Sequence, residues 1–164
     1  MMTRKLLLLC ALALSVGAQN TPDEVDRTRF YFASGSVTLS GSGSAFTIQL
    51  PAKSSSRVYL QSAYIECSAD CVLTQERNGS AATTTAVAAV PTNGGGTPAA
   101  TFYQSSDSTS GSVLVSLNVK ANAGISLDMT ASAFSRNGGT AQNHTFRVGA
   151  MTGTVKVSLR WGER

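Results

Sequence analysis

The sequence predicts an all-β domain, built as an antiparallel sandwich of two sheets. Several segments alternate apolar with polar residues, which is the pattern of a strand with one buried face. Clusters of glycine, asparagine and serine separate these segments and supply residues that accept the positive φ of tight turns. Beyond the first 18 residues, no segment has the periodicity of an amphipathic helix. Many short strands and turns without helices are typical of a sandwich or barrel.

We expect a jelly roll as the first choice of sandwich and an immunoglobulin-like fold as the second. An immunoglobulin domain packs a tryptophan against a disulfide that joins its two sheets. Here the only tryptophan, Trp161, follows Cys67 and Cys71 by about ninety residues instead of lying between two cysteines.

The strands can be placed along the chain from this alternation. It is clearest in residues 46–50, 113–120, 125–134 and 154–161, and residues 58–67 and 71–76 are also strand-like. Weaker strands are expected at residues 29–39, 81–90, 101–104 and 145–150. The turns between them are expected at residues 41–43, 78–79, 93–96, 110–111, 122–124, 137–139 and 152–153.

A secretion signal is predicted at the N-terminus. Arg4 and Lys5 precede an apolar run over residues 6–16, and small residues follow up to Ala18. A basic head, an apolar core of about 7–15 residues and a small-x-small ending are its three parts. The run is too short for a membrane helix, which needs about 20 apolar residues. Lipidation at Cys10 would reduce the run to four leucines, so we expect cleavage after Ala18.

The expected domain organisation follows from this cleavage. Residues 1–18 are the cleaved signal peptide, residues 19–28 form a flexible polar arm, and residues 29–164 form a single β-sandwich domain. No later segment is apolar enough to span a membrane as a helix. We expect a secreted protein, either extracellular or periplasmic.

The charge pattern argues against a nucleic-acid partner. Two of the 13 basic residues and none of the nine acidic residues leave with the signal, so the net charge falls from +4 to +2. The remaining lysines and arginines are scattered, whereas a nucleic-acid surface clusters them among aromatics. Charged residues are 13% of the chain, against about 25% in an average domain. Such a hydroxyl-rich surface is typical of exported β-proteins.

Cys67 and Cys71 are expected to form a disulfide, the default for a cysteine pair in an oxidising compartment. Four residues of extended strand span roughly 13 Å, while bridged Cα atoms lie within about 7 Å. We therefore expect a hairpin with a three-residue tip at residues 68–70. A redox or metal pair is the alternative, but it would require a Cys-x-x-Cys motif or further cysteine and histidine ligands.

Three segments carry a resemblance to a known kind of domain: residues 123–128, residues 145–148 and the closing residues 153–159. Their strand and turn pattern resembles the last strands of small jelly-roll β-sandwich domains of viral and phage surface proteins and of trimeric extracellular proteins. The resemblance covers the C-terminal third and implies a fold and a tendency to assemble, without an active site. The secretion signal departs from the phage members, which need no export.

The sequence offers little catalytic chemistry. His144 is the only histidine, and we interpret it as a solvated residue at a loop-to-strand junction. No serine lies in the Gly-x-Ser-x-Gly motif of a nucleophile elbow. The acidic residues are expected to be solvated, on the arm, the hairpin tip, a loop and outer strand faces: Asp23, Glu24, Asp26, Asp70, Asp107, Glu66, Glu76, Asp128 and Glu163. We predict no catalytic residue, no metal site and no cofactor.

Aromatic residues are the remaining candidates for a binding face. Tyr31, Tyr103 and Trp161 are the candidates, because exposed tyrosine and tryptophan serve as surfaces for sugars and proteins. The alternative is that they belong to the core or to a sheet edge. The expected function is an exported, non-enzymatic structural or interaction module whose partner is a second copy, a glycan or a surface protein. A carbohydrate-binding or adhesive module is the alternative, and a hydrolase using His144 is the second alternative.

Overall fold

Antiparallel strands make up all the regular secondary structure in the described part of the chain. A computed structural model describes residues 28–52, 54–78, 85–93, 96–105, 111–129, 133–135 and 141–164, the segment 133–135 by its backbone alone. These residues contain no helix, which confirms the predicted all-β antiparallel class. Their ten strands are β1 (Arg29–Leu50), β2 (Arg57–Cys67), β3 (Cys71–Arg77), β4 (Thr85–Val87), β5 (Val90–Pro91), β6 (Thr101–Ser105), β7 (Ser112–Val119), β8 (Gly124–Asp128), β9 (Ala133–Ser135) and β10 (Gln142–Glu163).

The predicted signal peptide lies outside the described residues, as does the predicted arm except for Thr28. No helix in the described ranges is long and apolar enough to cross a membrane.

The two longest strands, β1 and β10, form an antiparallel ribbon through the whole molecule. They pair from Arg29 opposite Glu163 to Leu50 opposite Gln142, with register shifts between Ser40 and Ser44. Gly41 has a φ of 89° at this irregularity, a conformation that glycine accepts without steric cost. The predicted turns at residues 41–43 and 152–153 are therefore bends within long strands. Each of the two strands replaces a pair of shorter predicted strands.

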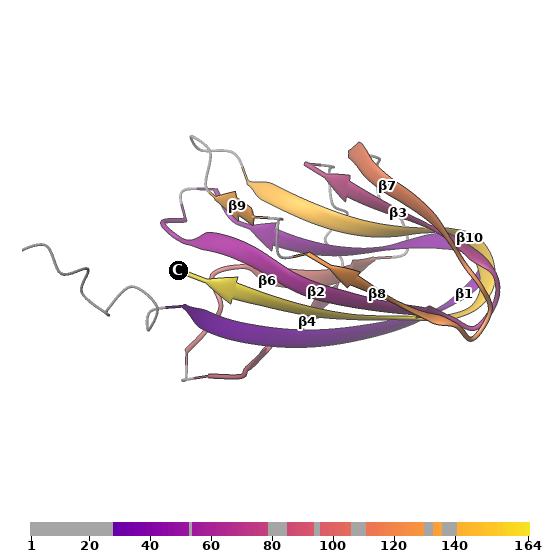
Figure 1. Cartoon of the computed structure of the whole chain (residues 1–164), viewed down its shortest axis with the longest axis horizontal. Helices are drawn as coiled ribbons and strands as arrows, with labels where there is room; N and C mark the ends of the chain where they lie inside the picture. The colour runs from indigo at the N-terminus through magenta and orange to yellow at the C-terminus, as the bar shows by residue number, and fades with distance from the viewer. Residues whose placement is uncertain are drawn as a thin grey trace, which may run out of the picture.

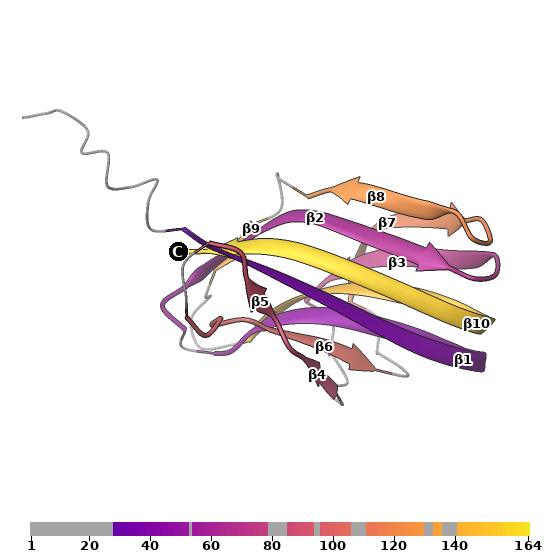
Figure 2. The same cartoon turned by 90° about the horizontal axis from the view of Figure 1, so that it is seen from below.

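The bend in this ribbon folds the sheet into two layers (Figures 1 and 2). In the first sheet, residues 29–40 of β1 and 152–163 of β10 pair with β5 and β2, and β8 and β9 pair with β2. In the second sheet, residues 44–50 of β1 and 142–148 of β10 pair with β6 and β3, which carry β4 and β7. The result is a two-layered antiparallel β-sandwich.

The predicted hairpin at residues 68–70 is wrong, although the chain does turn there. β2 and β3 do not pair with each other; they lie one after the other along β10, on residues 155–163 and 144–148. The turn carries the chain from the first sheet to the second at the end where β1 and β10 bend (Figure 1). Both strands pair with β10, each in a different sheet, so residues 68–70 form a corner between the sheets.

The core lies between the two sheets. Inward residues alternate along the long strands, as with Phe46 and Ile48 on β1 and Val155 and Val157 on β10, all with 0% exposure. Aromatic rings fill the second sheet's side, where Phe46 stacks on Phe102 with ring centres 6.3 Å apart. The period-two pattern of the sequence thus marks the core face correctly in these strands.

Candidate functional site

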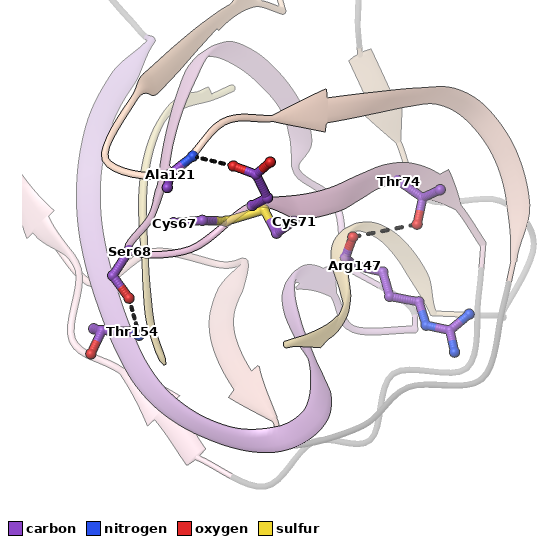
Figure 3. The surroundings of a disulfide bond; sticks show 8 residues. Cys67, Ser68, Cys71, Thr74, Ala121, Arg147 and Thr154 are labelled. Atoms are coloured by element: carbon purple, nitrogen blue, oxygen red, sulfur yellow. Dashed lines mark hydrogen bonds between the residues drawn. A yellow bond between two sulfur atoms is a disulfide. The ribbon is translucent and has the colours of Figure 1, made fainter. Parts of the chain in front are cut away.

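Cys67 and Cys71 form the predicted disulfide across the corner between β2 and β3, with Cα atoms 6.5 Å apart. Residues of this corner also form hydrogen bonds with neighbouring chain segments (Figure 3). The Ser68 hydroxyl oxygen accepts a hydrogen bond of 2.7 Å from the Thr154 amide, and the Asp70 carboxylate accepts one of 2.8 Å from the Ala121 amide. The bridge therefore joins a network that fixes three chain segments where the sheet folds over.

Asp70 also bonds Lys120 at 2.8 Å. This hydrogen bond, followed by the one from the Ala121 amide, lowers the pKa of the Asp70 carboxyl below its usual range. Both side chains are exposed, so this ion pair contributes little to the stability of the fold.

Removing the disulfide should lower the free energy of unfolding by about 2 kcal/mol, because the bridge closes only a short loop of the unfolded chain. The variant is the double substitution Cys67→Ala and Cys71→Ala, since both cysteines are buried and alanine adds no polar group. Urea unfolding measures the difference. Reduced wild type is the matched control and should unfold like the double variant, and equal stability of oxidised wild type and variant would contradict the structural role.

Tyr31 and Trp161 lie side by side in the core, which is the alternative that the sequence left open for them and excludes them as an exposed binding face. Their exposed fractions are 1% and 0%, and their rings stack with centres 5.7 Å apart. The two residues are direct cross-strand partners on β1 and β10, and both take the inward face of the first sheet. Phe32, the next residue on β1, points outward instead and is 40% exposed. Adjacent residues of a strand point to opposite faces, so burial of Tyr31 places Phe32 on the outer face.

Glu163 closes this aromatic cluster and is also buried, contrary to the solvated position expected for it. Its carboxylate accepts hydrogen bonds from the Trp161 indole at 2.9 Å and from the amides of Ala99 and Ala100 at 2.7 and 2.9 Å. The three donors satisfy the hydrogen-bonding capacity that a buried carboxylate would otherwise lose with its hydration. Glu163 therefore connects the loop before β6 to β10. Both of its carboxylate oxygens already accept hydrogen bonds from the protein.

Tyr103 lies apart from the other two predicted aromatics. It is half-buried on β6 in the second sheet, opposite Thr47. The structure thus does not bring Tyr31, Tyr103 and Trp161 into one binding face. On the same sheet Glu76 is 1% exposed and accepts a 2.8 Å hydrogen bond from the Gly111 amide, so it too departs from its expected solvated position.

His144 is completely buried within β10, so its interpretation as a solvated loop residue is wrong. It is 0% exposed, and among the described residues neither ring nitrogen has a hydrogen-bond partner. Burial, and then the nearby charge of Arg77, lower the pKa of His144 to about 4. Its ring packs against Phe146 with centres 5.3 Å apart. This imidazole has the surroundings of a core residue.

Comparisons with family models, curated proteins and solved structures find no significant match. Within the described ranges, no group of three or more His, Cys, Asp or Glu residues could hold a metal ion. Function must therefore be argued from the surfaces of the sandwich.

The edge strand β7 has the largest cluster of exposed apolar side chains along one described strand. Val113, Leu114 and Val115 are 54%, 48% and 40% exposed, and among the described strands β7 pairs only with β3. Proteins usually protect such an edge with lysine, proline or a covering element, because an open apolar strand can pair with another chain. The sequence identified this strand but could not show that it lies at an edge.

Proposed function

We propose that the chain is an exported, non-enzymatic structural or interaction module that self-associates through the edge strand β7. The observation that carries this proposal is the exposure of three consecutive apolar residues, Val113, Leu114 and Val115, on an eight-residue strand at the end of the second sheet. Exposed apolar patches on a sheet edge favour association by strand addition. We place this module outside the cytoplasm, where the predicted signal and the disulfide are compatible with an oxidising compartment.

A second copy of the same chain suits this edge. β7 carries no charged residue over Ser112–Val119, so two copies can pair antiparallel without opposing like charges. With a two-fold axis at Val115, that residue faces its own copy, and Val113 faces Leu117 of the other chain. Such an isologous pairing would extend the sheet and cover apolar side chains on both copies.

The absence of enzymatic activity is also part of the proposal. The His144 nitrogens form no hydrogen bond with any residue that the structure describes, whereas a histidine acting as a general base must lie within hydrogen-bond reach of a nucleophile. A hydrolase using His144 would need the core to open.

For the finer fold assignment we propose the jelly roll. Four times along the chain, two successive strand segments lie in opposite sheets. The four pairs are the two halves of β1, then β2 and β3, then β7 and β8, and then the two halves of β10. This alternation supports a jelly roll with its two interleaved sheets. It agrees with the resemblance to jelly-roll domains that assemble.

Sedimentation velocity on residues 19–164 tests self-association. We expect wild type to sediment as a dimer or larger species, and the double variant Val113→Lys and Val115→Lys as a monomer, because lysine protects sheet edges. Val72→Lys is the matched control: Val72 is 48% exposed on the neighbouring inner strand β3, and its replacement should leave the oligomer intact. A monomeric wild type at every concentration tested would overturn the proposal.

A further inference from the structure

The outer face of the first sheet carries a groove of about 300 Å³ that is distinct from the β7 edge. It is lined by Phe32, Ser62, Ala63, Tyr64, Ser126, Ser158 and Arg160. Two aromatic residues from different strands, Phe32 and Tyr64, are 40% and 41% exposed. Three serines, Ser62, Ser126 and Ser158, share this lining, so the surface combines apolar ring faces with small hydrogen-bonding groups.

Two glycines allow aromatic rings to lie along this face. A Cβ on Gly124 would clash with three atoms of Tyr64, including its hydroxyl oxygen, so the Tyr64 ring occupies the space over β8. Gly162 has the same relation to Phe30, whose ring atoms would lie 2.9 and 3.1 Å from such a Cβ. The rings are therefore fitted against the sheet instead of extending freely into solvent, which reduces the entropy lost when a ligand binds.

Among the described residues that line the groove, Arg160 alone is charged. Its guanidinium lies 5.8 Å from the centre of the Phe30 ring, and it forms no ion pair with a described residue. The other charges of this face lie beyond the lining. Lys156 and Glu66 form an ion pair with each other at 3.6 Å. Asp128, on β8, is the cross-strand partner of Ser62. A guanidinium held on an aromatic ring keeps its planar edge of N–H donors for a carboxylate.

We propose that this groove binds an oligosaccharide that contains a carboxylated sugar. The apolar faces of the sugar rings stack on Phe32 and Tyr64, as aromatic surfaces allow. The serine hydroxyls bond the sugar hydroxyls, and Arg160 holds the carboxylate in a charge-assisted pair. The inference is independent of self-association through β7, because the two surfaces belong to different sheets and share no residue.

Isothermal titration calorimetry with an oligogalacturonate tests the proposal, with the fully methyl-esterified oligomer as the neutral ligand of the same chain. We expect the acid form to bind, and Phe32→Ala and Tyr64→Ala each to weaken it by about tenfold or more. Arg160→Gln should weaken the acid form by about tenfold and leave the ester unchanged. Tyr103→Ala and Arg147→Gln, on the second sheet, are the matched controls and should bind as wild type does.

Three outcomes would overturn the proposal. Absence of binding by wild type removes the groove as a site for this ligand class. Equal binding of acid and ester, unaffected by Arg160→Gln, removes the carboxylate recognition. If Phe32→Ala and Tyr64→Ala instead dissociate an oligomer in sedimentation velocity, this face is an interface between copies. Thermal melts identical to wild type show that these surface variants are folded.

Discussion

Replacing Trp161 with alanine should lower the free energy of unfolding by about 3–5 kcal/mol, as expected for a large core side chain. The indole is completely buried and stacks on Tyr31. Its truncation leaves a cavity beside Tyr31 and removes one donor from the buried Glu163 carboxylate. Because an under-bonded buried charge adds to the cost of the cavity, we expect the upper part of this range. Urea unfolding of residues 19–164 measures it.

Two further variants separate the contributions to this loss. Trp161→Phe keeps a ring against Tyr31 but lacks the N–H donor, so it should cost about 1–2 kcal/mol. Phe32→Ala removes a ring from the outer face of the same sheet and should change stability by no more than about 0.5 kcal/mol. If Trp161→Ala lost less stability than Trp161→Phe, that result would contradict the packing described for this cluster.

Acidification should destabilise the fold through His144, by about 3 kcal/mol between pH 7 and pH 4. The pKa of this imidazole falls from the ordinary 6.5 to about 4 in the folded chain. Between these values the unfolded chain binds a proton that the folded chain does not, so stability decreases as the pH falls. Well above pH 6.5 both states are neutral at this residue, and the contribution is constant. Urea unfolding at intervals of pH gives the profile.

His144→Leu is the variant that isolates this effect. Leucine keeps an apolar contact with Phe146 and removes two buried nitrogens that have no partner. The free energy of unfolding of the wild type should therefore rise towards that of the variant as the pH increases from 4 to 6.5. At higher pH the two free energies should differ by a constant amount. Carboxyl groups titrate in both proteins and cancel in the difference. A constant difference across this range would show that His144 is not buried in its neutral form.

The fold class could be read from the sequence because a half-buried strand must alternate its residues. Residues 46–50 and 154–161 show this alternation, and their inward side chains form the core. The continuity of β1 and β10 was missed because a glycine cluster looks the same at a turn and at a bend within a strand. Only the partner strand distinguishes them, and pairing between residues 29 and 163 leaves no local signal.

The exposed and buried positions of the candidate site residues were harder to predict. They depend on which face of each strand meets the other sheet. Tyr31 and Phe32 are adjacent, so a choice of face decides which of them is exposed, and the sequence of this strand is apolar on both sides. Glu163 and His144 are polar residues in buried positions. Glu163 is accommodated by three donors, one of them on its own strand and two before β6. His144 remains neutral, a state that no spacing of residues could indicate.

The order in which this protein can fold follows from the position of β10. Residues 142–163 pair with β1 along both sheets and carry β2 and β3 on their other side. Neither layer has its central strand until these residues have been synthesised, and the pairing of Arg29 with Glu163 closes a loop of nearly the whole domain. Contacts so distant in sequence form slowly, because loop closure precedes the gain from pairing. The nascent chain therefore stays without a complete sheet through most of its synthesis and folds only when its last strand is available.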